Sequence, residues 1–175
     1  MSCGGLAWSL EDKLFDASLL GDEQLAQRLA PLPRPLVITN GVFDVLHRGH
    51  VGYLHAARQI GGSLIVALNT DASVRALSKG ADRPLNHDMD RALVLAGLAA
   101  VDAVTFFAQP TPLALLARLR PDIYVKGGDY NMEELEETRL VRSWGGIAKS
   151  IAFLKGYSTT SLVHRVREGG PGRED

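Results

Sequence analysis

Two histidines separated by an arginine and a glycine, His47-Arg48-Gly49-His50, have the residue types and spacing that most clearly suggest chemistry in this sequence. A branched apolar run ends before them at Asn40-Gly41, and an apolar pattern at helical spacing follows them, so they lie in a loop between a strand and a helix. The unpaired N–H groups at a helix start attract anions. Gly41 permits a sharp turn, and Gly49 leaves no side chain to block a ligand. The pattern predicts a phosphate-binding site.

Two other interpretations of these histidines are a pair of solvated loop residues and a zinc site. A tetrahedral zinc site needs three or four protein ligands, whereas the remaining histidines are scattered and Cys3 is the single cysteine. The two glycines, the strand end and the helix start favour the phosphate site, and no metal-ligating residue is predicted.

Two further polar clusters follow predicted strands near the C-terminus. Lys126 ends a buried-type strand, from which its side chain can reach over the sheet edge toward an anion. The hydroxyl run at 158–161 opens the last predicted helix, where it can cap the helix, form a second phosphate cradle, or do both.

Four weaker candidates lie in loops. Lys79 and Arg83 are as consistent with a solvated loop as with phosphate binding. Asp44 and Asp71 suit a contact with magnesium or a sugar hydroxyl, but turn capping explains them almost as well.

The elements that position these residues alternate between strand and helix about five times. Strands are predicted from residue 36 to the Asn40-Gly41 turn and at 63–68, 103–107, 123–125 and 147–153, and helices at about 51–59, 88–98, 112–119, 133–144 and after 158. This order is typical of an α/β fold: a Rossmann-like, doubly wound, parallel five-stranded sheet with helices on both faces. Ligands bind at the carboxyl ends of such strands, where the polar clusters fall.

The chain of 175 residues suits one main domain. We predict an N-terminal helical segment and proline-rich connector at 1–34, a main domain at 35–168 that carries the phosphate-site residues, and a disordered tail at 169–175. The N-terminal segment carries no clustered polar groups, so a packing role or a dimer contact is favoured over a catalytic one.

Composition excludes several classes of partner and compartment. A formal charge of −1 argues against a general nucleic-acid or acidic-membrane surface, and the single cysteine fits a reducing interior. There is no signal-peptide pattern and no apolar run of membrane-spanning length, so a cytoplasmic protein is expected.

The sequence contains neither G-x-x-x-x-G-K-[ST] nor G-x-G-x-x-G, and no G-x-S-x-G nucleophile elbow. Cations, imidazoles and helix starts are present without an obvious activated nucleophile. If the attacking group is itself a phosphate, it is already anionic and needs no general base. The protein then has only to align it and neutralise charge on the leaving pyrophosphate.

The full set of motifs resembles the cytidylyltransferase-like nucleotidyltransferases, whose H-x-G-H motif follows the first strand of the sheet. The resemblance covers about residues 36–168. It rests on Asn40-Gly41-x-Phe43-Asp44-x-x-His47-x-Gly49-His50, Asn69-Thr70-Asp71, Arg83-Pro84, Arg91, Lys126-Gly127-Gly128-Asp129-Tyr130 and Ser158-Thr159-Thr160. Val42 departs from the pattern, since many such enzymes have cysteine there.

Within that superfamily, residues 125–130 and 158–163 are particularly similar to the family of D-glycero-β-D-manno-heptose 1-phosphate adenylyltransferases. This resemblance implies transfer of AMP from ATP to the sugar 1-phosphate, giving ADP-heptose and pyrophosphate for the lipopolysaccharide inner core. It implies Mg²⁺ bound mainly through the ATP phosphates, and a homodimer is plausible. Because the chain is too short for a sugar-kinase domain, the heptose kinase would be a separate polypeptide.

The resemblance also assigns roles to residues. The catalytic residues would be His47, His50 and Lys126. The nucleotide would contact these three together with Asn40, Gly41, Val42, Phe43, Gly49, Gly127, Asp129, Tyr130, Ser158, Thr159 and Thr160. The sugar phosphate would contact Asp44, Asp71, Lys79, Arg83 and Arg91.

Two alternatives remain open at this point. One keeps the fold but uses CTP with glycerol 3-phosphate or a phosphoalcohol, because base choice depends on the shape of the pocket. The other is a non-catalytic nucleotide-binding domain, because fold alone does not fix function.

Overall fold

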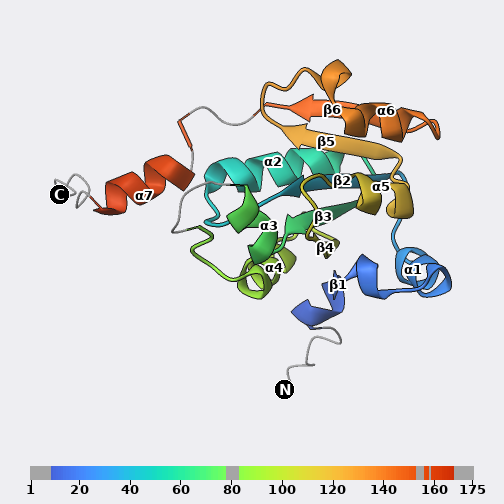
Figure 1. Ribbon diagram of the computed structural model, residues 1–175, viewed down its shortest axis with the longest axis horizontal. Helices are drawn as coiled ribbons and strands as arrows, with labels where there is room; N and C mark the ends of the chain where they lie inside the picture. Colours follow the sequence, from blue (N-terminus) through green and yellow to red (C-terminus); the bar gives the residue numbers. More distant parts are fainter. Residues whose placement is uncertain (1–8, 78–82, 153–155, 158, 168–175) are drawn as a thin grey trace, which may run out of the picture.

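The computed structural model describes residues 9–77, 83–152, 156–157 and 159–167. Its centre is a six-stranded parallel sheet in the order β1-β4-β3-β2-β5-β6. In Figure 1 the sheet runs from β6 at the top to β1 at the bottom. The strands are β1 (Leu14–Phe15), β2 (Leu36–Gly41), β3 (Ser63–Asn69), β4 (Ala103–Phe107), β5 (Ile123–Gly127) and β6 (Ile147–Ile151).

The helices connect these strands. The α-helices are α1 (Asp22–Leu29), α2 (Arg48–Gln59), α3 (Asp71–Ala76), α4 (Asp88–Ala96), α5 (Leu113–Leu119), α6 (Glu136–Arg142) and α7 (Thr159–Arg167), and three short 3-10 helices lie at Leu10–Lys13, Ala17–Leu19 and Met132–Glu134. The predicted helix at 133–144 is therefore divided into a 3-10 turn and α6. The predicted tail at 169–175 lies outside the described residues.

The predicted Rossmann-like α/β class is confirmed, but the predicted count of five strands is wrong. The sixth strand is β1, which pairs with β4 through Leu14↔Val104 and Phe15↔Thr105. A two-residue strand is too short to show any periodicity, so no sequence pattern predicts it. The segment expected to be helical is instead a 3-10 turn, β1, a second 3-10 turn and α1.

Two hydrophobic clusters hold helices on the two faces of the sheet. On one face, Tyr53 and Leu54 of α2 and Leu95 of α4 pack against alternate residues of β2, β3 and β4. On the other face, Leu116 of α5 and Val141 of α6 pack against the intervening residues of the same sheet. Strands buried on both faces need near-continuous apolar sequence, which β3 has from Leu64 to Leu68 between its buried polar ends.

The N-terminal segment joins the second cluster through Phe15, Ala17 and Leu25. Lys13 Nζ also donates hydrogen bonds to the carbonyl oxygens of Ala96 and Val101, at the end of α4 and just beyond it. A cation at the C-terminal end of a helix is favourable there.

The strand order reverses between β2 and β5. From β2 the chain runs outward through β3 to β4, then crosses back to β5 and continues to β6. Carboxyl-end loops diverge at such a point and leave a crevice for a ligand. None of the described helices has the length and apolar content needed to cross a bilayer.

Candidate active site

His47 is the N-cap of α2. Its Nδ1 accepts a hydrogen bond from Gly49 N at 3.1 Å, and its carbonyl oxygen accepts one from His50 N at 2.9 Å. The sequence pattern placed the start of this helix at about residue 51, after His50. The helix in fact begins at Arg48, so His50 lies inside its first turn. Both imidazoles therefore lie at the positive end of a twelve-residue helix.

The two imidazole rings stack, with centroids 3.9 Å apart and planes inclined by 22°. The ring of Phe43 meets His50 edge-on at 5.3 Å. Phe43 holds this position with a backbone φ of 46°, an unusual value for a bulky residue and one found mainly where surrounding structure enforces it.

Two glycines make room for these rings. A Cβ at Gly49 would lie 2.9 Å from His47 Cε1 and 3.1 Å from Tyr157 Cβ. A Cβ at Gly41 would lie 2.9 Å from a ring atom of Phe43. The space expected to admit a ligand at Gly49 is thus occupied by the His47 ring and the Tyr157 stem.

The environment of both histidines favours their neutral form. Burial lowers the pKa of His47. Burial and then repulsion from His47 lower the pKa of His50 to about 4. An arriving triphosphate favours the charged imidazolium, so this pair is poised to take up a proton when an anion binds.

Beside His50 lies a pocket of ≈ 790 Å³ over the carboxyl ends of β2, β3, β4 and β5. It brings together eleven residues that the sequence assigned to a site: Asn40, Gly41, Val42, Phe43, Asp44, His50, Arg83, Lys126, Gly127, Tyr130 and Thr159. Its volume suits a small-molecule ligand.

Lys126 extends from β5 into this pocket. Its Nζ lies 5.5 Å from the centroid of the Tyr130 ring and 4.0 Å from Glu137 Oε1 on α6. The lysine thus carries its charge over the edge of the sheet, as expected for a residue that meets an anion.

Hydroxyl groups support the strand ends beneath the pocket. Tyr124 on β5 donates a hydrogen bond to Asn40 Oδ1 at 2.7 Å. On the other face of the sheet, the Tyr53 hydroxyl shares a hydrogen bond of 2.5 Å with Thr39 Oγ1 and donates one of 3.4 Å to the Val125 carbonyl. Burial raises the pKa of both tyrosines above the usual value, so both stay protonated.

The start of α7 closes the pocket on the side of the β2–α2 loop. Thr159 Oγ1 donates a hydrogen bond of 3.2 Å to the Val45 carbonyl. Just before it, the Tyr157 hydroxyl accepts a hydrogen bond of 3.3 Å from Arg48, whose guanidinium lies over the tyrosine ring. Ser158 lies outside the described residues, and Thr160 is placed only as a member of α7.

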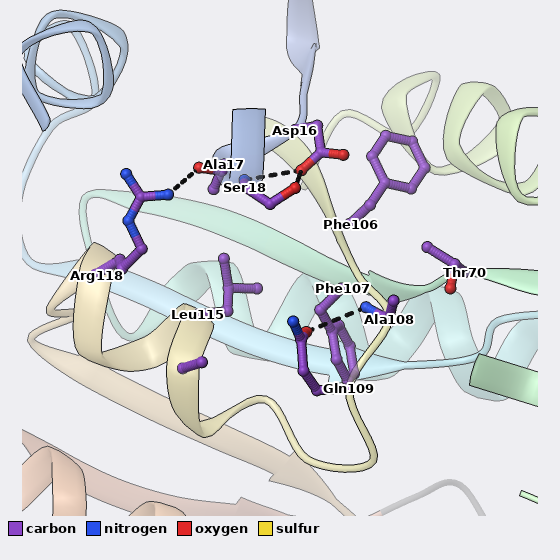
Figure 2. A pocket seen from close by; sticks show the side chains of 11 residues that line it. Asp16, Ala17, Ser18, Thr70, Phe106, Phe107, Ala108, Gln109, Leu115 and Arg118 are labelled. Carbon is purple, nitrogen blue, oxygen red and sulfur yellow. Dashed lines mark hydrogen bonds between the residues drawn. The ribbon is translucent and has the colours of Figure 1, made fainter. Parts of the chain in front are cut away.

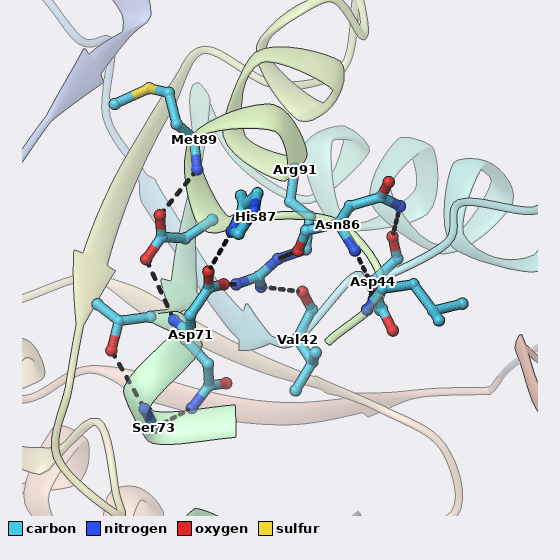
Figure 3. Close-up of polar contacts among 12 residues, drawn as sticks. Val42, Asp44, Asp71, Ser73, Asn86, His87, Met89 and Arg91 are labelled. Atoms are coloured by element: carbon cyan, nitrogen blue, oxygen red, sulfur yellow. Dashed lines mark hydrogen bonds and ion pairs between the residues drawn. The ribbon is translucent and has the colours of Figure 1, made fainter. Parts of the chain in front are cut away.

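Asp44 is buried and its contacts are within the protein. It accepts hydrogen bonds from Arg83 Nη1 at 2.6 Å and from the backbone N–H groups of Leu85 and Asn86 at 2.8 and 3.0 Å. Figure 3 shows Asp44 hydrogen-bonded to Asn86 in the loop before α4. Asp44 is therefore an anchor for this loop, and it presents Arg83 to the pocket.

Asp71 and Arg91 lie outside the residues that line the pocket and contact each other (Figure 3). Arg91 is 2% exposed and donates to Asp71 Oδ1 at 2.7 Å, to the Val42 carbonyl at 2.6 Å and to the Asn86 carbonyl at 3.0 Å. His87 Nδ1 lies 3.0 Å from the other oxygen of Asp71. Arg91 thus joins three loops that surround the pocket.

The remaining predicted residues are distributed as follows. Lys79 lies outside the described residues. Three further residues do not line the pocket: His47, Gly49 and Asp129. His47 stacks on His50, which does line it.

Sequence reasoning missed eight residues of the lining: Tyr53, Asn69, Val74, Leu77, Phe107, Pro110, Pro112 and Glu137. Tyr53 had a usable signal, because it lies three residues after His50 and so on the same side of the helix. Asn69 belongs to the Asn69-Thr70-Asp71 motif of the family resemblance, but it was not assigned a role in the site. The others depend on how separate elements come together.

A second, smaller pocket of ≈ 250 Å³ adjoins the first at Phe107, which lines both. Figure 2 shows it between Asp16 and Ser18 of the N-terminal segment and Leu115 and Arg118 of α5. Arg118 donates hydrogen bonds there to the carbonyl oxygens of Ala17 and Leu20.

The fold, the histidine pair at the start of α2 and the pocket at the strand-order reversal define a class of protein. The chain belongs to the cytidylyltransferase-like family, whose model matches residues 38–165. It is 56% identical over 157 residues to the D-beta-D-heptose 1-phosphate adenylyltransferase of Bordetella bronchiseptica, an alignment that covers 89% of this chain and 97% of that relative. The predicted family resemblance is confirmed.

Larger relatives share the same region. The bifunctional protein HldE of Magnetococcus marinus is 53% identical over 131 residues, and that of Streptomyces coelicolor is 49% identical over 145 residues. These alignments cover 75% and 83% of this chain but only 27% and 31% of the relatives. The chain therefore spans less than a third of these bifunctional proteins.

A solved structure supports the fold. The lipopolysaccharide core biosynthesis protein of Thermoplasma volcanium matches with a TM-score of 0.58 and 27% sequence identity, over 70% of this chain and 98% of that one.

Proposed function

We propose that the protein is an adenylyltransferase that transfers AMP from ATP to D-glycero-β-D-manno-heptose 1-phosphate, with ADP-heptose and pyrophosphate as products. The observation that carries the proposal is the single pocket that holds His50, Lys126 and Thr159 together. The 56% identity to a heptose 1-phosphate adenylyltransferase over nearly the whole of both chains supports ATP and this sugar phosphate over CTP and glycerol 3-phosphate.

The reaction needs alignment and charge neutralisation more than proton transfer. An oxygen of the sugar phosphate forms a bond to the α-phosphorus of ATP as the bond from that phosphorus to the β-phosphate oxygen breaks. The attacking phosphate is already anionic, which agrees with the lack of a proposed general base. Negative charge grows on the leaving pyrophosphate, where Lys126 and the positive end of the α2 helix dipole stabilise it.

The histidines contact the triphosphate in this proposal. His47 keeps its ring fixed by the hydrogen bond from Gly49 N and stacks on His50, which faces the pocket. A His50 side chain that gains a proton on anion binding donates a charge-assisted hydrogen bond to a phosphate oxygen. Thr159 lines the same pocket, and its hydroxyl donates a hydrogen bond to the Val45 carbonyl.

The pocket fits Mg²⁺ that is held mainly by the triphosphate. Asp44 is the carboxylate of the β2–α2 loop that lines the pocket, and it is already engaged with Arg83 and two backbone N–H groups. Among the described residues, no three His, Cys, Asp or Glu side chains are grouped so that they could hold a metal ion. When bound, Mg²⁺ supplies further charge neutralisation on the phosphates.

The pathway context follows from the proposed reaction. The product would supply lipopolysaccharide inner-core synthesis, and we propose that the sugar 1-phosphate comes from a pathway that includes a separate heptose kinase. Both substrates are metabolites of the cell interior, so we expect the enzyme to act in the cytoplasm. The predicted homodimer stays a prediction.

Pyrophosphate release tests the proposal. The purified protein with Mg²⁺ is given ATP or CTP, each with heptose 1-phosphate or glycerol 3-phosphate, and the sugar nucleotide is identified by mass spectrometry. We expect turnover with ATP and heptose 1-phosphate, and a loss of about 100-fold or more in kcat for His50→Ala. Faster turnover with CTP and glycerol 3-phosphate would establish the alternative enzyme. No turnover by a folded protein that binds ATP would indicate a binding domain.

A further inference from the structure

A carboxylate lines a pocket that is otherwise suited to phosphates. Glu137 is 8% exposed and lies in the first turn of α6, and its side chain faces the same pocket as His50 and Lys126. Burying a carboxylate is costly unless it gains partners. Its Oε1 is 4.0 Å from Lys126 Nζ, an ion-pair distance that is longer than a hydrogen bond.

The carboxylate has capacity for a ligand. Within the part of the chain that the structure describes, the Glu137 carboxylate has an ion pair with Lys126 at 4.0 Å but accepts no hydrogen bond. A carboxylate has two oxygens and about four acceptor positions. The carboxylate is largely shielded from bulk solvent but lines the pocket. A hydrogen-bond donor on a bound ligand could therefore reach it.

The surroundings indicate which ligand group this is. Glu137 would repel a phosphate placed against it, so its natural ligands are neutral donors such as hydroxyl groups. Nearby in the same pocket, Asn40 has its amide oxygen occupied by the Tyr124 hydroxyl at 2.7 Å, which leaves the amide NH₂ group as a donor. A hydroxyl both donates and accepts, so a pocket lined by an acceptor and a donor suits a polyhydroxylated molecule.

The histidines and Glu137 are carried by helices on opposite faces of the sheet. α2, which carries the histidines, packs on one face, and α6, which carries Glu137, packs on the other. Phe107, Pro110 and Pro112 add apolar lining to the pocket. Apolar side chains of this kind can cover the C–H groups of a sugar ring.

We propose that Glu137 recognises the sugar of the acceptor substrate, because its carboxylate accepts hydrogen bonds from hydroxyl groups of the sugar 1-phosphate. The proposal rests on the proposed adenylyltransferase function and adds a specificity-determining residue to it. The ribose of ATP offers the same hydroxyl chemistry, but the phosphate-binding groups of α2 lie on the opposite face from α6, which favours the acceptor sugar.

The main test is the steady-state kinetics of Glu137→Gln. Loss of a hydrogen bond to a charged acceptor is expected to raise KM for heptose 1-phosphate about 10- to 100-fold, with KM for ATP not raised. Charge removal alone has the opposite sign: it removes a negative charge from a pocket that binds anions, which lowers KM for both phosphorylated substrates. A raised KM for the sugar phosphate therefore cannot come from electrostatics alone.

Inorganic phosphate is the probe that separates hydroxyl from phosphate recognition. Its inhibition constant against heptose 1-phosphate should be unchanged or lower in Glu137→Gln, because phosphate has no sugar hydroxyls. A rise in this constant that parallels the rise in KM would overturn the proposal, since the variant would then have damaged phosphate binding.

The exposed neighbour Glu136 provides the matched control. Glu136→Gln makes the same charge change one residue away on α6, and both KM values should stay within about twofold of wild type. Glu137→Asp, which retains the charge but withdraws it by one methylene group, should give an intermediate KM. If Glu137→Gln does not fold, Glu137→Asp carries the test, and an unaltered KM for the sugar phosphate in that variant contradicts the proposal.

Binding of 2′-deoxy-ATP and 3′-deoxy-ATP distinguishes the two sugars. If the wild type prefers ATP over either analogue and Glu137→Gln loses that preference, Glu137 recognises ribose and the proposal is wrong. If the wild type is active and Glu137→Gln behaves like wild type in every measurement, the proposal is also wrong. An inactive wild type would instead reject the proposed function itself.

Discussion

The imidazole of His47 lies in a stack on that of His50, with the ring centroids 3.9 Å apart, at the first turn of α2. Two protonated rings would repel at this distance, and burial further disfavours a charge on His50. The free protein therefore keeps neutral rings where the proposed reaction needs positive charge. This relationship links anion binding to proton binding.

We predict that ATP binding is accompanied by proton uptake near pH 6. The pKa of His50, about 4 in the free protein, rises when a triphosphate lies beside it. Calorimetric titrations of ATP in buffers of different ionisation enthalpy should show uptake of up to about one proton near pH 6 and less at pH 8.

His55, exposed on the same helix, gives the control for this linkage. Proton uptake should persist in His55→Gln and decrease strongly in His50→Gln. Equal uptake in the two variants would exclude His50 as the linked group.

Gly49→Ala should reduce turnover much more than stability. The new Cβ would lie 2.9 Å from His47 Cε1 and 3.0 Å from His47 Nδ1, so the ring must move and its hydrogen bond from Gly49 N is lost. Displacing a substrate-positioning group by about 1 Å can cost about 100-fold in rate, and we expect kcat to fall by about that factor.

Gly97→Ala is the matched control for Gly49→Ala. Gly97 follows α4 with a φ of −69°, and a Cβ there meets no atom closer than 3.4 Å. Its kcat and melting temperature should stay near those of wild type. A Gly49→Ala enzyme with wild-type kcat would show that the position of the His47 ring does not matter for the reaction.

Much of the sheet could be predicted from sequence because parallel strands buried on both faces need continuous apolar runs. The run at 63–68 and the run at 103–107 match β3 and β4 to within one residue. β1 could not be predicted, since Leu14 and Phe15 become a strand only through their pairing with β4. Tertiary contact, and not local sequence, makes that strand.

The site was only partly predictable for a similar reason. A strand end, a helix start and H-x-G-H locate His50, but nothing local distinguishes Glu137 from Glu133, Glu134 and Glu136 in the same run. The fold turns Glu137 inward, while Glu133 forms an exposed ion pair with Arg142. In the same way, residue type alone cannot tell an arginine that binds substrate from one that is buried against Asp71.

The buried position of Arg91 predicts a large loss of stability for Arg91→Met. The change leaves Asp71 and the carbonyl oxygens of Val42 and Asn86 without their donor, and breaking a buried ion pair costs about 3–5 kcal/mol. Urea unfolding should show a reduction of this size in the free energy of unfolding. Arg91→Lys should lose less, because it keeps the charge but not the branched donor geometry.

Arg75, exposed on α3, is the control for Arg91. Arg75→Met should change the free energy of unfolding by less than about 0.5 kcal/mol. If Arg91→Met is as stable as Arg75→Met but has a strongly raised KM for the sugar phosphate, then Arg91 contacts substrate in solution and its structural role is overestimated.

The pH dependence of stability should differ in sign between His87 and His50. The hydrogen bond with Asp71 raises the pKa of His87 above its usual value of 6.5, and the charges of Asp71, Asp90 and Asp88 add to this. A raised pKa stabilises the folded state below pH 6.5, and that contribution is lost as the pH rises through the folded-state pKa. For His50 the lowered pKa means that stability is retained above pH 6.5 and lost as the pH falls toward about 4.

Melting temperatures of His87→Gln, His50→Gln and His55→Gln, measured from pH 5 to pH 8.5, test this difference. Relative to wild type, His87→Gln should be most destabilised at pH 5 to 6 and approach wild type at pH 8.5, because its partner Asp71 then faces a neutral ring in wild type as well. His50→Gln should compare best with wild type at pH 5, because there the unfolded wild type takes up a proton on His50 that the folded state does not bind. His55→Gln should follow wild type throughout. Parallel curves for His87→Gln and His50→Gln would contradict the assigned directions, since a raised and a lowered pKa cannot shift stability in the same sense across one pH interval.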